Sequence, residues 1–146
     1  MPFKRLLCAV DFSRESLAAF RVAVEMALLH SGSFHILHVM EVQPVLSEWL
    51  PINGMGEVTT QIVEKANAAM ETLVSSVQPP LEGLSFTTEV NSGTAFVEIV
   101  NRTREWNADL IVLGAKGAAS LEKIVIGSTA ERVLKDATCS VLIVRN

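Results

Sequence analysis

Short apolar runs alternate with helical patterns along the whole chain, and this order constrains the fold more than any other feature. A strand-like run is followed by a helix-like pattern four times, and a fifth strand-like run comes last. Such alternation predicts a five-stranded parallel sheet with helices on both faces, joined by right-handed crossovers. We therefore expect an α/β fold in which residues 1–146 form one domain. The expected strands span 5–10, 34–40, 84–90, 109–113 and 140–145, and the expected helices span 13–30, 57–78, 94–106 and 128–135.

The charge and hydropathy of the chain argue against several partners. The formal charge is −4 and the Lys and Arg residues form no cluster, which disfavours nucleic acid or an anionic membrane. No apolar run approaches the ~18 residues that span a bilayer, and Asp11 ends the first apolar run well short of a secretory signal. We expect a cytoplasmic protein. Cys8 and Cys139 are expected to be buried thiols, because no C-x-x-C spacing or activating base accompanies them.

A glycine-rich turn follows the fourth expected strand. Gly114 and Gly117 come directly after that strand, and Gly127 precedes the last helical pattern. Glycines let the backbone approach an anion, and the first N–H groups of a helix have no partner within it. The turn therefore predicts phosphate binding through the backbone of 127–129. Lys116 either adds charge to this site or faces the solvent.

Two polar residues near the expected site have structural explanations as well. Asp11 directly follows the first strand, and ligands of open parallel sheets bind beyond the carboxyl ends of strands where the winding reverses. Its carboxylate could accept hydrogen bonds from ribose hydroxyls or help to hold a metal, but Asp11 or Ser13 could instead cap the following helix. Ser128 and Glu131 fit a capping box, which does not exclude phosphate binding by the backbone.

Several other chemistries find no support in the spacing of residues. The patterns G-x4-G-K-[ST], G-x-G-x-x-G after the first strand and G-x-S-x-G are all missing, and we predict no catalytic residue. His35 and His38 lie three apart in a strand, so they point to opposite faces and cannot share a metal. The connection 42–56 is long for a crossover. Its Trp49 and Leu50 either cap a ligand, meet a partner or pack on the sheet edge.

The chain resembles the universal stress protein family over nearly its full length. The family's nucleotide-binding signature, G-x2-G-x9-G-[ST], is satisfied by Gly114, Gly117, Gly127 and Ser128. Residues 9–13, 37–39, 109–114 and 139–145 are similar to the family too, whereas Phe12 is bulkier than the residue common after the aspartate and 118–120 depart from the pattern. The resemblance implies a Rossmann-like sheet with strand order 3-2-1-4-5. It also implies that the chain binds ATP, AMP or ADP, with or without Mg²⁺.

The resemblance also implies roles for particular residues. Asp11 would contact adenine or ribose, Val39 would line the adenine pocket, and the glycine loop with Ser128 would hold the phosphates. Members of the family pair through their last strands, and the apolar run from Val141 to Val144 lacks the charge or proline that protects an open edge. We therefore expect a homodimer through this strand. The implied nucleotide-binding residues are Val10, Asp11, Ser13, Val39, Gly114, Lys116, Gly117, Gly127, Ser128 and Thr129.

Three functions fit these features. The first is a nucleotide-binding sensor or regulatory module of the stress response. The second is an enzyme that slowly hydrolyses ATP or transfers its phosphoryl or adenylyl group, and product analysis after incubation with ATP and Mg²⁺ separates it from the first. The third is a protein-interaction module without nucleotide, against which the intact glycine signature argues.

Overall fold

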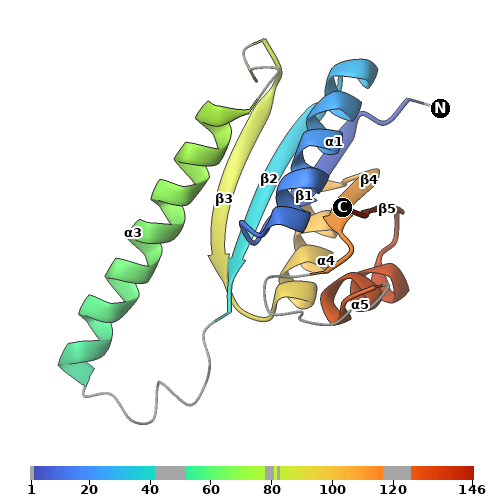
Figure 1. Cartoon of the computed structure of the whole chain (residues 1–146). Coiled ribbons are helices and arrows are strands. Elements are labelled where there is room, and N and C mark those ends of the chain that lie inside the picture. The colour runs from blue at the N-terminus through green and yellow to red at the C-terminus, as the bar shows by residue number, and fades with distance from the viewer. Residues whose placement is uncertain (1, 42–51, 78–80, 82, 117–125) are drawn as a thin grey trace.

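The computed structural model describes residues 2–41, 52–77, 81, 83–116 and 126–146, and the side chains of 52–59 lie outside this description. Strands and helices alternate as the sequence predicts (Figure 1). No helix in the described part of the chain is both long and apolar enough to cross a membrane. The elements are β1 (Arg5–Ala9), α1 (Arg14–His30), β2 (Ser33–Met40), α3 (Ile52–Ser76), β3 (Phe86–Ser92), α4 (Ala95–Trp106), β4 (Leu110–Gly114), α5 (Ser128–Asp136) and β5 (Ser140–Val144).

The five strands form one parallel sheet in the order β3-β2-β1-β4-β5. This confirms the predicted fold class and strand order. The chain first runs outward from β1 to β2 and β3, and then returns across β1 to add β4 and β5 on the other side. The winding direction therefore reverses between β1 and β4, which is where an open α/β sheet leaves space for a ligand.

Both faces of the sheet are covered by helices, and each face has its own apolar core. Leu6 and Cys8 of β1 point to the face that α1 and α3 cover, where they pack with Phe20 and Met70. Alternate residues of the same strands point to the face that α4 and α5 cover, as Leu7 does. Burial on both faces explains why these strands are continuously apolar rather than alternating.

Helix α3 and strand β3 differ most from the sequence-based expectation. Helix α3 begins at Ile52, so five residues that were assigned to the long connection are helical, including Gly54 and Gly56. A glycine inside a helix costs about 1 kcal/mol, but this 25-residue helix gains from burying a stripe that includes Met70 and Leu73. Strand β3 begins two residues later than expected, because the N–H of Leu84 donates to the Leu81 carbonyl in a turn. Residues 42–51, with Trp49 and Leu50, lie outside the described part of the chain.

The starts of β1 and β4 are joined by one carboxylate. Asp109 accepts hydrogen bonds from the backbone N–H groups of Lys4 at 2.8 Å and Arg5 at 3.0 Å, and its own N–H donates to the Arg5 carbonyl. The Arg5 guanidinium lies 4.3 Å from the centre of the Trp106 ring and donates to the Trp106 carbonyl. These contacts fix the pairing of β1 with β4, and so determine where the two strands end on the opposite side.

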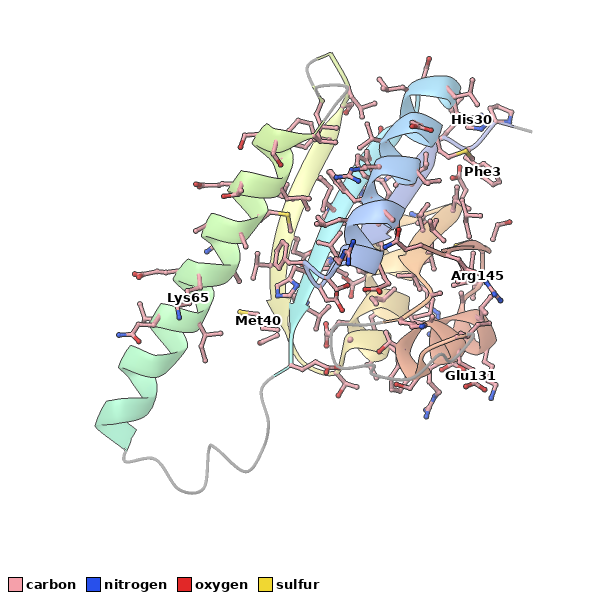
Figure 2. All side chains as sticks on the ribbon, viewed as in Figure 1. Phe3, His30, Met40, Lys65, Glu131 and Arg145 are labelled. Atoms are coloured by element: carbon pink, nitrogen blue, oxygen red, sulfur yellow. The ribbon has the colours of Figure 1, made fainter. Side chains whose placement is uncertain are left out.

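The N-terminal segment is also tied to the end of α1. The Phe3 and His30 rings meet edge to face with their centres 5.5 Å apart, and both lie at the end of the sheet away from the carboxyl ends of the strands (Figure 2). The Lys4 ammonium donates to the His30 carbonyl at 2.7 Å, which satisfies one of the last carbonyl groups of the helix. This end of the sheet is therefore closed by local contacts, and the other end is left for a site.

Replacing Asp109 with alanine should lower the free energy of unfolding by about 1–2 kcal/mol, because two backbone donors lose their acceptor. Asparagine at this position keeps one acceptor oxygen and should lose less. Urea unfolding of the wild type and both variants measures the difference. Equal midpoints for all three proteins would show that water replaces the carboxylate without loss.

Candidate functional site

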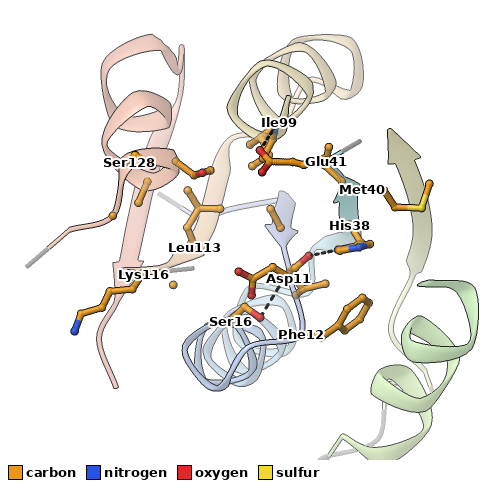
Figure 3. A pocket seen from close by; sticks show the side chains of 18 of the residues that line it. Asp11, Phe12, Ser16, His38, Met40, Glu41, Ile99, Leu113, Lys116 and Ser128 are labelled. Atoms are coloured by element: carbon orange, nitrogen blue, oxygen red, sulfur yellow. Dashed lines mark hydrogen bonds between the residues drawn. The ribbon is translucent and has the colours of Figure 1, made fainter. Parts of the chain in front are cut away.

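A cavity of about 940 Å³ opens at the carboxyl ends of β1, β2 and β4 (Figure 3). Its walls are completed by one side of α3 and by the N-terminal turns of α4 and α5. The cavity therefore lies at the predicted reversal point of the sheet. The predicted site residues that line it are Val10, Asp11, Val39, Gly114, Lys116, Gly127, Ser128 and Thr129.

One further predicted residue, Ser13, has a structural role beside the cavity. Ser13 is the N-cap of α1, and its hydroxyl oxygen accepts a hydrogen bond from the Ser16 N–H at 3.2 Å. The structure therefore gives Ser13 the capping role that the sequence left open. Gly117 lies outside the described residues.

Asp11 stands at the centre of the cavity and also braces the turn into α1. Its Oδ1 accepts a hydrogen bond from the Ser13 N–H at 3.0 Å, and its own N–H donates to the Ser16 hydroxyl at 3.2 Å. The side chain is exposed and lines the cavity. A carboxylate accepts several hydrogen bonds at once, so the Asp11 side chain suits a ligand hydroxyl.

Phe12 adopts a backbone conformation that bulky residues rarely take. Its φ is 64°, in the left-handed region, where a side chain with a Cβ is strained. The conformation brings its ring to the cavity wall, with its centre 4.6 Å from the centre of the His38 ring. The sequence signal for an aromatic ring at the cavity wall was the bulk of Phe12 beside Asp11.

His38 is held in one orientation by the end of β1. Its Nδ1 lies 2.7 Å from the Val10 carbonyl oxygen, and because a carbonyl can only accept, Nδ1 carries the proton. In the neutral ring Nε2 is then an acceptor. His35 points to the opposite face, where it contacts Thr87 and Glu89, so the prediction that the two histidines cannot share a metal is confirmed.

The cavity contains two helix N-termini that differ in their capping. At α4 the Thr94 side chain makes no capping hydrogen bond, and Glu41 takes its place by accepting from the Ala95 N–H at 3.0 Å. At α5 the N-cap is Gly127, without any side-chain capping bond. A carboxylate thus occupies one N-terminus, whereas the backbone N–H groups of the other face the cavity.

The predicted capping box at Ser128 is wrong. Ser128 is the first residue of α5 and is exposed, and Glu131 pairs with Lys135 at 3.2 Å instead. The reason is tertiary, because the N–H of Gly127 donates to the carbonyl of Ala115 and starts the helix one residue early. Gly127 therefore has no N–H for an anion, and the donors that remain are those of residues 128–130.

Gly114 is required by packing. A Cβ on this residue would lie 2.9 Å from the backbone carbon and oxygen of Glu15 and 3.1 Å from the nitrogen of Ser16. The first turn of α1 therefore touches the end of β4 directly. The signature glycine was predicted as a point of anion approach, and the structure adds a structural requirement to that prediction.

Two further groups bear on chemistry. Lys116 is half-buried in the cavity wall, and Figure 3 shows its side chain extending away from Asp11. Burial raises the pKa of the Cys8 thiol, and burial together with the Asp109 carboxylate raises the pKa of Cys139, so neither is a thiolate nucleophile at neutral pH. Among the described residues no group of three or more His, Cys, Asp or Glu could hold a metal ion.

Comparison with known proteins assigns the chain to a family. The model of the universal stress protein family matches residues 2–145, so the chain belongs to this family. The universal stress protein MJ0531 of Methanocaldococcus jannaschii is 32% identical over 98% of this chain and 82% of its own length. The solved structure of the universal stress protein UspA from Lactobacillus plantarum has a TM-score of 0.84 at 27% identity, with 99% of each chain covered. The family predicted from the glycine signature is confirmed.

At least two solved structures of similar fold contain a nucleotide, which is cAMP in one and dAMP in another; the second has the higher TM-score. This second structure is the universal stress protein from Archaeoglobus fulgidus in complex with dAMP, which has a TM-score of 0.68 and covers 98% of each chain. Its sequence identity to this chain is 20%. At that identity the likeness concerns the fold, and the dAMP belongs to that protein.

Replacing Gly114 with alanine should lower the free energy of unfolding by about 1–3 kcal/mol, because the new methyl group meets the backbone of α1 rather than a movable side chain. The measurement is urea unfolding without nucleotide, so that binding does not contribute. An unchanged midpoint would show that the first turn of α1 moves away freely.

Proposed function

We propose that this protein binds an adenine nucleotide in the cavity at the carboxyl end of the sheet and acts as a cytoplasmic sensor or regulatory module of the stress response. The observation that carries the proposal is the composition of the cavity. One continuous space joins a carboxylate at Asp11, apolar walls that include Val39, and the exposed start of α5. A nucleotide presents the same sequence of groups, namely hydroxyls, a planar base and phosphates.

The charges around the cavity favour one place for the phosphates. The carboxylates of Asp11 and Glu41 repel an anion, and Glu41 already occupies the N-terminus of α4. The start of α5 offers the N–H groups of residues 128–130 together with the positive end of the helix dipole. The Ser128 and Thr129 hydroxyls lie at the same place and can donate as well. We therefore infer that the phosphates lie against α5.

The base then lies toward β2. Val39 packs on the same apolar cluster as Leu113 and Ile99, and all three line the cavity. Such a wall suits the faces of a purine, and Asp11 between the wall and α5 suits the ribose hydroxyls. The dAMP complex of the Archaeoglobus fulgidus protein supports an adenine mononucleotide as the ligand class.

We assign no catalytic residue to the site. A Mg²⁺ that enters with a triphosphate would bind mainly to phosphate oxygens and water. Slow hydrolysis of ATP stays the alternative, and sensing of nucleotide is the function that we propose.

We further propose that β5 forms a homodimer. It is an edge strand of the sheet, and Val141 to Val144 are only partly buried although all are apolar. The Val144 carbonyl accepts from Ala115, so the polar backbone groups of Val144 point into the sheet. Since direction alternates along a strand, those of Val141 and Ile143 point outward and can pair with a second copy.

Replacing Val141 with proline should convert the dimer to a folded monomer, because it removes an outward N–H without breaking a bond to β4. Leu142→Pro is the contrast, since its N–H points toward β4 and its loss should destabilise the fold itself. Sedimentation at tens of micromolar gives the oligomeric state. A monomeric wild type, or a Val141→Pro dimer, would place the interface elsewhere.

Replacing Gly127 with valine should abolish binding of ATP while the fold persists. The φ of Gly127 is −75°, which valine adopts, so the effect is the bulk of the side chain at the start of α5. The wild type should melt at a higher temperature with millimolar ATP, and the variant should not. Thr94→Val is the matched control, because Thr94 is the N-cap of α4 and makes no capping bond. A Gly127→Val protein that ATP stabilises as much as wild type contradicts the proposed phosphate position.

A further inference from the structure

We propose that the cavity accepts adenine nucleotides whose exocyclic amine carries an apolar substituent, which would occupy a compartment between α3 and the end of β2. This rests on the nucleotide binding proposed above and adds a ligand class to it. The compartment is lined by Phe12, His38, Met40, Ile62, Ala66 and Ala69. We call it the α3 compartment.

The α3 compartment lies on a different face of the sheet from the apolar wall around Val39. Residues of β2 alternate in direction, so His38 and Met40 point to the face of α1 and α3, whereas Val39 points to the face of α4 and α5. Figure 3 shows Phe12, His38 and Met40 toward α3, Ser128 on the other side, and Asp11 between them. Figure 2 shows Met40 facing α3, with Lys65 on the same helix.

Small residues on α3 leave the compartment open. Ala66 and Ala69 line it from the helix, one turn apart, and the larger residues Met70 and Leu73 pack into the core instead. The whole cavity, at about 940 Å³, is near the upper end of the range of ~300–1,000 Å³ for small-molecule sites. Among the described residues, a nucleotide placed between β2 and α5 therefore leaves space on the α3 side.

The strained conformation of Phe12 serves the compartment. A φ of 64° is unfavourable for phenylalanine, and strain of this kind persists where the surroundings hold it, often at a binding site. Here it holds the ring against His38 and at the cavity wall. Met40 beside it is a flexible, polarisable side chain that adapts to apolar groups of different shape.

We place the edge of the base that carries the exocyclic amine toward this compartment. With the phosphates against α5 and the base toward β2, Phe12 and His38 line the part of the cavity beyond the base on the α3 side. A singly substituted amine keeps one N–H, and in the neutral ring of His38 the Nε2 atom can accept it, because Nδ1 donates to the Val10 carbonyl. The substituent itself would pack on Phe12, Met40 and the alanines of α3.

The probe is ATP that carries a benzyl group on its N6 amine, compared with ATP by titration calorimetry on the full chain. We expect the substituted nucleotide to bind roughly tenfold more tightly, which corresponds to the burial of one aromatic group. If the substituted nucleotide binds as tightly as ATP or more weakly, the inference is overturned, whereas binding of ATP itself still supports the proposed function. If neither nucleotide binds, the proposed function and this inference both fall.

Variants locate the substituent. Ala69→Phe fills the compartment and should abolish the tenfold gain while the affinity for ATP stays within about twofold, since α3, which carries Ala69, lies on the opposite side of the sheet from α5 (Figure 1). Ala68→Phe, on the exposed side of the same helix, should keep the gain. Glycine suits the positive φ at position 12, so Phe12→Gly should fold and removes one wall of the α3 compartment. We expect it to lose the tenfold gain in affinity as well. If both Ala69→Phe and Phe12→Gly still bind the substituted nucleotide tenfold more tightly than ATP, the benzyl group does not lie in the α3 compartment and the inference is overturned.

Discussion

The burial of β1 between β2 and β4 is the constraint on which the rest of the structure depends. Leu6, Leu7 and Cys8 are fully buried, so the central strand is apolar on both faces and must be flanked by strands and covered by helices on each side. Because the chain leaves β1 in one direction and returns on the other side, the winding direction reverses at the carboxyl ends of β1 and β4. The cavity is the space that this reversal leaves open.

The sequence predicted the fold almost completely, because the fold follows from local periodicity. Strand order came from the resemblance to the family, and the described elements confirm it. The start of α3 was missed, since two glycines and a proline near Ile52 read as a loop although burial further along the helix compensates for them. Local helix propensity is a weak guide to the start of α3, because the burial of Met70 and Leu73 further along the helix stabilises it.

Most of the residues predicted for the site line the cavity, but the hydrogen bonds around the cavity were not predicted. Its polar contacts join positions far apart in the chain, as between Glu41 and Ala95 or between Gly127 and Ala115. No spacing rule contains such pairs, and they decide which helix start carries a carboxylate and which N–H groups face the cavity. The packing of Gly114 against Glu15 is another contact between distant positions that no spacing rule predicts. A signature glycine can therefore serve the fold and the ligand at once.

Helix α3 is held in the core near its C-terminal end, so a tilt of the helix displaces its N-terminal end the most. Its C-terminal half is held in the core by Met70 and Leu73, and its middle forms the cavity wall at Ile62 and Lys65 (Figure 1). At 1.5 Å per residue, Ile52 lies about 27 Å along the axis from Met70, so a tilt of about 10° displaces that end by about 5 Å. A change in the width of the cavity that tilts α3 about Met70 would therefore displace Ile52 more than it displaces the cavity wall at Ile62.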